Sequence, residues 1–319
     1  PANVDVAVIG AGYTGLHAAV ATARAGASTP VLDAEAAGWG CSTRNGGQIS
    51  TSVKPDFETL TRRHGRERAA AILREGQASL DHVAGFVAQE GIDCAFSVCG
   101  RFHGAHTRRR YAAMVEACRT PHPVLDTGAY AVSPEDLPAE LGTRAYHGGM
   151  VLPRHASLDP GRYHAGLVAL ARAAGAVLVP QCAATALNPE APGHRVTTAR
   201  GTIRARDVVI ATNGYTGTIT PWHRRRVIPI GSYVIATEEL PRETIDRLFP
   251  RDRIVSDTRR VVYYYRASPD RRRILFGGRV SLAETDPRRS APALRDELVR
   301  LFPEIAGVRV ARYWMGFVG

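Results

Sequence analysis

A group of closely spaced glycines near the N-terminus is the first feature of this 319-residue chain that could bind a ligand. The glycines have the spacing Gly-x-Gly-x-x-Gly, in the run Gly10, Ala11, Gly12, Tyr13, Thr14 and Gly15. In such a turn the first glycine permits the bend, the second lets the backbone approach a pyrophosphate, and the third brings the helix against the sheet. The start of that helix offers free N–H groups to phosphates. The run therefore predicts a dinucleotide site.

An acidic residue and a second glycine-rich loop follow this turn. Asp33 ends the next predicted strand, where a carboxylate can bind both ribose hydroxyls of an adenosine, and we include its neighbour Ala34 in the site. A loop rich in glycine that also carries an arginine can wrap a phosphate and lie close to a flat ring. An NAD dehydrogenase would continue here with further βαβ units, so the order favours FAD. The loop residues that we expect to contact it are Ser42, Arg44, Asn45, Gly46, Gly47 and Gln48.

The elements that would position these residues are those of an α/β (α+β) fold. Apolar runs predict buried strands at 4–9, 30–33, 176–179 and 203–211, with helices at 13–25 and 160–174 between them. Segment 57–90 is helical with a break near Gly65, and segment 92–102 alternates like a strand. Segments 233–237, 261–266 and 274–277 alternate like antiparallel strands of a separate sheet.

These elements predict two interleaved domains. A discontinuous Rossmann-like FAD-binding domain would comprise residues 1–52, 145–225 and 307–319. A helical insert and an antiparallel-sheet substrate domain would comprise residues 53–144 and 226–306.

Composition excludes other classes of protein. The net charge is +11, but its arginine clusters at 108–110, 224–226 and 271–273 lack interleaved aromatics, so we interpret them as solvated faces and expect no nucleic-acid partner. No run of about 18 apolar residues occurs, so no transmembrane segment is expected. The histidines lack metal-ligand spacing, and no metal is expected. With no secretory signal and no paired cysteine motif, we expect reduced thiols and a cytoplasmic location.

The motifs together resemble the D-amino-acid-oxidase/glycine-oxidase superfamily of FAD-dependent oxidoreductases, in particular its γ-glutamylputrescine oxidase-like branch. The resemblance rests on the Gly-Tyr-Thr-Gly-Leu turn at 12–16, on Asp33, and on the Arg-Asn-Gly-Gly-Gln loop at 44–48, and it continues through segment 312–316. It implies that Ala184 contacts the adenine edge through its backbone. It also implies a third FAD-contacting turn, formed by Ala211, Thr212, Asn213 and Gly214.

The resemblance implies oxidation of a C–N bond in a small-molecule amine or amino-acid-like substrate. A hydride passes from the carbon beside the nitrogen to flavin N5, and the resulting imine hydrolyses. Electrons then pass to oxygen or to another acceptor. Because the reacting amine must be neutral, no strong general base is required.

Two features bear on the substrate. Relatives that oxidise amino acids carry an arginine after a Trp-x-Gly stretch to pair with the carboxylate, and segment 314–318 has none. This favours an amine or acylated polyamine, unless Arg266 or Arg279 supplies the charge from another strand. Tyr265 and Arg266 are our candidate catalytic residues, although the tyrosines at 263–265 could equally pack within the sheet.

Family members continue past the position of Gly319 with a turn that faces the flavin. A flavin-binding but catalytically incomplete fragment is therefore one alternative. A D-amino-acid dehydrogenase or glycine-oxidase-type enzyme is the other.

Overall fold

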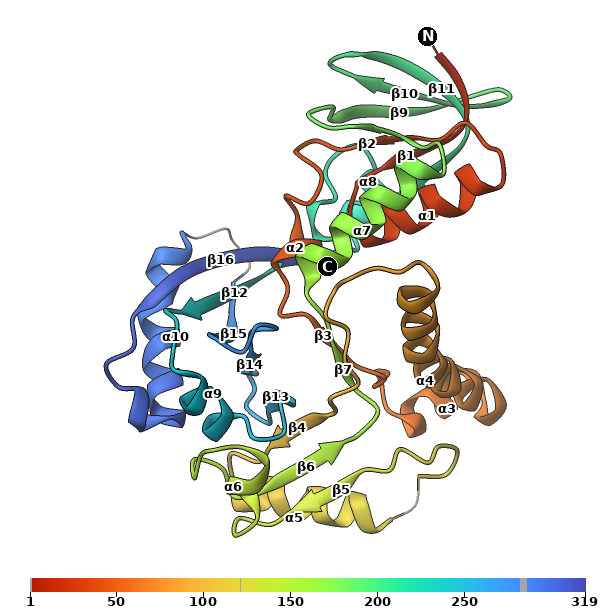
Figure 1. Cartoon of the computed structure of the whole chain (residues 1–319). Coiled ribbons are helices and arrows are strands. Elements are labelled where there is room, and N and C mark those ends of the chain that lie inside the picture. The colour runs from red at the N-terminus through yellow and green to blue at the C-terminus, as the bar shows by residue number, and fades with distance from the viewer. Residues whose placement is uncertain (1, 121, 282–285) are drawn as a thin grey trace.

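The strands form two large sheets, and the segments that build them alternate along the chain. The computed structural model describes residues 2–120, 122–281 and 286–319. A short ribbon of β3 (Gln48–Ile49) and β7 (Ala156–Ser157) lies between the two sheets (Figure 1). The fold is therefore a mixed α/β fold, and the predicted fold class is confirmed.

The first sheet is mainly parallel and is covered by helices. Its order is β8 (Val177–Val179), β2 (Pro30–Leu32), β1 (Ala2–Ile9), β11 (Gly201–Ile210), β10 (Gly193–Thr198) and β9 (Ala184–Glu190). The first four pair in parallel, and β10 and β9 continue the sheet antiparallel. Helices α1 (Tyr13–Arg24) and α7 (Pro160–Ala173) pack their apolar residues against it. The carboxyl ends of β1 and β2 thus meet at one edge, as in other open α/β sheets.

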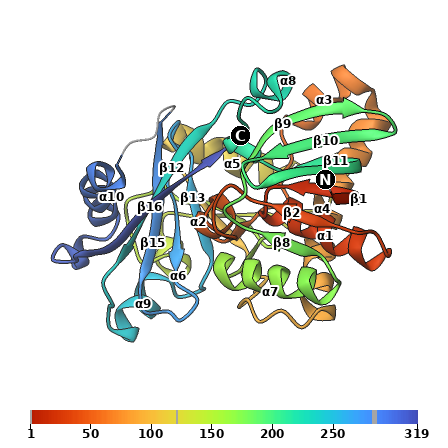
Figure 2. The same cartoon turned by 90° about the horizontal axis from the view of Figure 1, so that it is seen from above.

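The second sheet is mainly antiparallel and has two different faces. Its order is β16 (Val310–Val318), β12 (Ile230–Thr237), β15 (Ile274–Ser281), β14 (Tyr264–Ala267), β13 (Ile254–Asp257), β4 (Arg101–Gly104), β6 (Gly149–Leu152) and β5 (Tyr130–Val132). One face buries Phe102, Val255, Tyr265 and Phe276 against α9 (Arg242–Leu248) and α10 (Pro287–Leu301), which flanks the sheet in Figure 2. Because side chains alternate along a strand, the intervening residues point to the opposite face.

The other helices are short or lie outside the two sheets. They are α2 (Cys41–Arg44), α3 (Phe57–His64), α4 (Arg66–Gln89), α5 (Arg108–Arg119), α6 (Leu137–Glu140) and α8 (Pro221–Arg224), with 3₁₀ turns η1 (Asn213–Tyr215) and η2 (Pro303–Ile305). The break between α3 and α4 falls at Gly65, where it was predicted. Among the described residues, no helix combines the length and apolar character that crossing a bilayer requires.

Three expectations need correction. Within segment 92–102 only residues from Arg101 onward join a regular strand, and Ser97 makes an isolated bridge to Ser157. Segment 307–319 was expected in the FAD-binding domain, but β16 hydrogen-bonds along its length to β12 of the second sheet. Strand β6 likewise pairs with β4 and β5, so residues 149–152 also belong to the second sheet. The sheet to which β16 and β6 belong depends on the strands they pair with, and the residues of a strand do not show which strand that will be.

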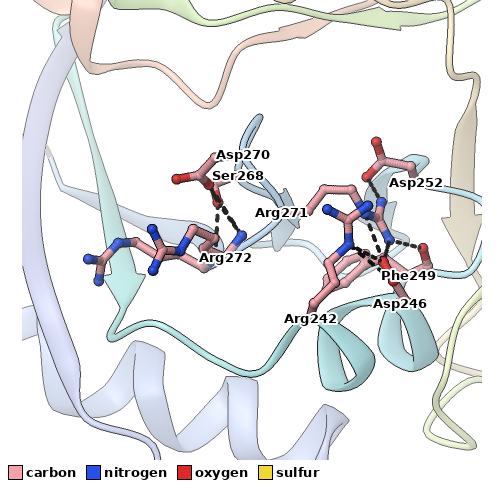
Figure 3. Close-up of polar contacts among 9 residues, drawn as sticks. Arg242, Asp246, Phe249, Asp252, Ser268, Asp270, Arg271 and Arg272 are labelled. Carbon is pink, nitrogen blue, oxygen red and sulfur yellow. Dashed lines mark hydrogen bonds and ion pairs between the residues drawn. The ribbon is translucent and has the colours of Figure 1, made fainter.

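The arginine run at 271–273 is also not a solvated face throughout. Arg271 follows β14 and is held by three partners of this chain (Figure 3). It donates to the Asp246 carboxylate at 2.6 Å and to the Phe249 carbonyl at 3.1 Å, and it forms an ion pair with Asp252. Its side chain is only 15% exposed, and the two carboxylates neutralise its charge.

Candidate cofactor and substrate site

Two adjoining cavities lie where the sheets approach each other. The first, of about 790 Å³, lies at the carboxyl ends of β1 and β2, and the second, of about 710 Å³, lies between loop 44–48 and the polar face of the second sheet. Tyr13, Cys41, Asn45 and Val318 line both. An elongated ligand could therefore extend from one cavity into the other.

The glycine turn shapes the first cavity. Gly10 has a φ of +107°, which favours glycine, and its N–H donates to the Leu32 carbonyl at 2.7 Å. A Cβ on Gly12 would lie 2.9 Å from Ser42 Oγ, and one on Gly15 would lie 1.9 Å from the Gly10 carbonyl oxygen. Larger residues would fill the turn or push α1 off the sheet. The start of α1 therefore stays open to the cavity.

The Asp33 carboxylate joins the turn to the end of β2. Its two oxygens accept from the Ala11 N–H at 2.7 Å and the Glu35 N–H at 2.9 Å. Ser42 Oγ accepts from the Tyr13 N–H at 3.0 Å, which ties loop 38–48 to the same turn. A carboxylate has further lone pairs, so Asp33 can also accept from a ligand hydroxyl.

Loop 44–48 lies where the two cavities meet and is fixed from several sides. Arg44 donates to the Met315 carbonyl at 3.2 Å, and Trp314 Nε1 donates to the Arg44 carbonyl at 2.7 Å. The Arg44 guanidinium lies 4.5 Å from the centre of the Trp39 ring. Gly47 has a φ of +64°, and its carbonyl accepts from the Leu158 N–H at 3.0 Å. The C-terminal strand thus holds the loop in place.

Polar side chains from four strands of the second sheet form the floor of the second cavity. Tyr264 of β14 shares a 2.7 Å hydrogen bond with Ser232 of β12, and Ser256 of β13 shares one of 2.8 Å with His103. Arg101 of β4 lies at the far side of this row. Burial raises the pKa of Tyr264, so its phenol is neutral at pH 7. The floor therefore offers hydroxyl groups at one end and a guanidinium at the other.

The expected catalytic residues Tyr265 and Arg266 do not line either cavity. Tyr265 is 1% exposed on the opposite face of the sheet, where its hydroxyl lies 3.0 Å from that of Tyr146. Arg266 shares the face of Tyr264 but is 4% exposed beneath Gly47, and it donates to the Leu158 carbonyl at 2.7 Å. The pleat thus directs Tyr265 into the core, and the loop covers Arg266. Tyr264 takes the position that we had expected for Tyr265.

The predicted cofactor residues divide between the two cavities. Those that line the first are Gly10, Ala11, Gly12, Tyr13, Thr14, Asp33, Ala34, Ser42, Asn45, Ala184, Ala211, Thr212 and Asn213. Those that line the second are Tyr13, Arg44, Asn45, Gly46, Gly47 and Gln48. Gly15 and Gly214 line neither cavity. Each allows two backbone segments to approach closely, and a Cβ on Gly214 would lie 3.0 Å from the Phe317 backbone.

Sequence reasoning missed several residues that line the cavities. They are Trp39, Tyr215, Arg101, Ser232, Ser256 and Tyr264. Trp39 and Tyr215 lie beside glycines of the turns already identified, so their place in the sequence could have predicted contact with the ligand. The others could be found only from the pairing of strands that are distant in sequence.

Comparisons with known proteins agree on one family. A family model described as FAD dependent oxidoreductase matches residues 5–319. The chain is 33% identical over 326 residues to the probable oxidoreductase OrdL of Rhizobium meliloti (strain 1021), which covers 99% of this chain and 73% of that protein. It is 28% identical over 316 residues to gamma-glutamylputrescine oxidoreductase of Escherichia coli (strain K12), covering 98% of this chain and 73% of that protein.

Solved structures share the fold. Glycine oxidase from Geobacillus kaustophilus superposes with a TM-score of 0.79 at 17% identity, covering 100% of this chain and 83% of that chain. L-proline dehydrogenase from P. horikoshii superposes with a TM-score of 0.78 at 17% identity, covering 99% and 82%. The chain belongs to the family of FAD-dependent oxidoreductases.

Proposed function

We propose that the two cavities together bind one FAD, with its adenosine in the first cavity and its ring in the second. The carrying observation is that the two cavities adjoin at Tyr13, Cys41 and Asn45, beside the open start of α1. Gly12 leaves room for a pyrophosphate there, and Asp33 retains lone pairs for ribose hydroxyls. The residues present thus fit the cofactor that the family uses.

This arrangement assigns the nucleotide to the first sheet and the substrate to the second. The nucleotide-binding domain would comprise the six-stranded sheet with α1 and α7, and the substrate domain would comprise the eight-stranded sheet. All five cysteines are free, which supports work in a reducing compartment such as the cytoplasm.

The reaction proposed is oxidation of a carbon–nitrogen bond to an imine that hydrolyses. FAD, when bound, supplies the two-electron acceptor. Among the described residues that line the second cavity there is no Asp, Glu or Lys. His17 also lines this cavity, and its Nε2 shares a 2.8 Å hydrogen bond with the Tyr163 hydroxyl. The chain therefore presents hydroxyl groups and one hydrogen-bonded imidazole, which suits an amine that reacts in its neutral form without a strong base.

The substrate proposed is an acylated diamine. A relative that is 28% identical is named gamma-glutamylputrescine oxidoreductase. Segment 314–318 contains no arginine, and Arg266 is held beneath the loop, so neither supplies a clamp for an α-carboxylate. The side chain of Arg279 lies outside the described part of the chain. An amine without an adjacent carboxylate fits this end of the cavity better than an α-amino acid does.

Anaerobic reduction of the bound flavin tests the substrate class. The flavin-loaded protein would be mixed with γ-glutamylputrescine, N-acetylputrescine, putrescine, glycine, sarcosine and D-alanine, and bleaching of the flavin absorbance would be timed. The proposal predicts the fastest bleaching with an acylated diamine. Faster bleaching by any α-amino acid would replace it with a glycine-oxidase-type activity, and retained flavin with no bleaching would indicate a catalytically silent protein. Hydrogen peroxide formed in air would identify oxygen as the acceptor.

A further inference from the structure

Arg101 and Arg44 are the arginines that line the second cavity within the described part of the chain, and both are half-buried. Arg44 is engaged by the Met315 carbonyl and the Trp39 ring. Arg101 lines the cavity, yet among the described residues no carboxylate lies within ion-pairing distance of it. Burial lowers the pKa of Arg101 to about 10, so the guanidinium is still charged at pH 7. A buried charge without a counter-charge is costly unless a ligand supplies one.

A buried histidine orients this guanidinium. Arg101 Nε donates to His155 Nδ1 at 2.9 Å, and His155 is 2% exposed. Burial, together with the charges of Arg101 and His103, lowers the pKa of His155 to about 4, so its imidazole is neutral at pH 7 and can accept this bond. Within the described part of the chain this is the hydrogen bond of the guanidinium, so the edge formed by the two Nη groups is available to a ligand. That edge matches the two oxygens of a carboxylate.

The surroundings of Arg101 favour an anion. Burial lowers the pKa of His103, and the positive charges of Arg101 and Lys54 lower it further. Asp257 acts on His103 in the opposite direction, but it is fully buried and forms an ion pair with Arg259. This end of the cavity therefore has uncompensated positive charge.

The sheet sets the distance between this charge and the hydroxyl end of the floor. Ser256 of β13 pairs with Tyr264 on one side and with His103 of β4 on the other. Arg101 lies two residues before His103, so its Cα is about 12 Å from that of Tyr264, two strand spacings across the sheet and two residues along it. An extended chain of roughly ten bonds spans that distance, since three backbone bonds cover about 3.5 Å. A substrate with its amine near Tyr264 would therefore place a group about nine to eleven bonds away beside Arg101.

We infer that Arg101 is a specificity-determining residue that binds a carboxylate at the end of the substrate remote from the oxidised amine. The inference rests on the proposed function, and it names the substrate class as an acylated diamine whose acyl group carries a carboxylate. The carboxylate contact then lies on β4, which four other strands separate from β16. His155 is the positioning residue for Arg101.

Kinetics of matched variants test this assignment. Arg101→Gln removes the charge, and Arg101→Lys keeps it without the planar fork. Arg206→Gln is the control, because Arg206 is exposed and lines neither cavity. For γ-glutamylputrescine, Arg101→Gln should raise KM roughly 10- to 100-fold with little change in kcat, and Arg101→Lys should fall between. For N-acetylputrescine, which lacks the carboxylate, KM should change less than about threefold. Equal losses on both substrates, or no loss on either, would overturn the inference.

A binding measurement separates failure of this inference from failure of the proposed function. Calorimetric titration of the flavin-loaded protein with butyrate and with its neutral isostere butyramide requires no turnover. The inference predicts that the wild type binds butyrate and not butyramide, and that Arg101→Gln, with an unchanged thermal midpoint, loses butyrate binding. If no amine is oxidised but this pattern holds, the Arg101 site stands and only the reaction is wrong. Equal binding of butyrate by wild type and Arg101→Gln would refute the site.

Discussion

The two cavities are built in different ways. The first takes its turn, its carboxylate and its loop from residues 9–45, which are nearly continuous in sequence. The second takes its floor from Ser232, Ser256, Tyr264 and Arg101, which come from four strands of one sheet. Local backbone geometry therefore determines the first cavity, where we propose the nucleotide binds, whereas strand register determines the second, where we propose the substrate binds. Changes at the first should alter cofactor retention, and changes at the second should alter substrate selection.

The largest effect is expected at loop 44–48, where the two cavities meet. A Cβ on Gly47 would lie 2.1 Å from the Leu158 carbonyl oxygen, in a backbone conformation with a φ of +64°. Gly47→Ala should therefore lower the free energy of unfolding by about 2–5 kcal/mol, as well as expel the flavin. A Cβ on Gly46 would lie 3.1 Å from the Tyr264 ring, so Gly46→Ala is the milder, matched change. Equal denaturation midpoints for both variants would show that the loop is not fixed by Leu158.

A smaller effect is expected from Asp33→Ala at the nucleotide end. The change leaves the Ala11 and Glu35 N–H groups without their acceptor and removes the proposed ribose contact. FAD affinity should fall by about 1–3 kcal/mol, or roughly 5- to 150-fold in Kd. Fluorescence titration of the apoprotein with FAD would measure it. Asp126→Ala is the control, because Asp126 also accepts from a backbone N–H, at 3.0 Å, but lines neither cavity. An unchanged Kd for Asp33→Ala would argue against the nucleotide assignment.

The smallest effect separates the two faces of the second sheet. Tyr264→Phe removes the hydroxyl that bonds Ser232 in the cavity, and Tyr265→Phe removes the hydroxyl that bonds Tyr146 in the core. Each bond contributes about 1 kcal/mol. Tyr264→Phe should lower kcat/KM about fivefold with little change in thermal midpoint, and Tyr265→Phe should do the reverse. If Tyr265→Phe lowered kcat/KM and Tyr264→Phe lowered only the thermal midpoint, Tyr265 would be the catalytic residue instead.

The residues that line the first cavity could be predicted from the sequence, because each of its features is local. The spacing of Gly10, Gly12 and Gly15 and the position of Asp33 after a short strand each carry their own structural meaning. Most of the residues expected at the cofactor do line a cavity.

The substrate end could not be predicted in the same way. The alternation of side chains along the strand left open whether Tyr264, or instead Tyr263 and Tyr265, faces the cavity. The pairing of Tyr264 with Gly277 of β15 and with Ser256 of β13 determines which face each tyrosine takes. Arg101 was part of a predicted strand, but its neighbour β13 is about 150 residues away. The same reason explains β16, whose partner β12 places it in the other sheet.

A crystal structure of the FAD-loaded protein would show directly how the cofactor lies in the two cavities. We expect one FAD to extend through both cavities, with its adenosine beside Asp33 and Ala184 and its ring beside loop 44–48 and Tyr264. The adenosine in the second cavity, or a ring that contacts neither Gly46 nor Tyr264, would contradict the proposed division between a nucleotide end and a substrate end.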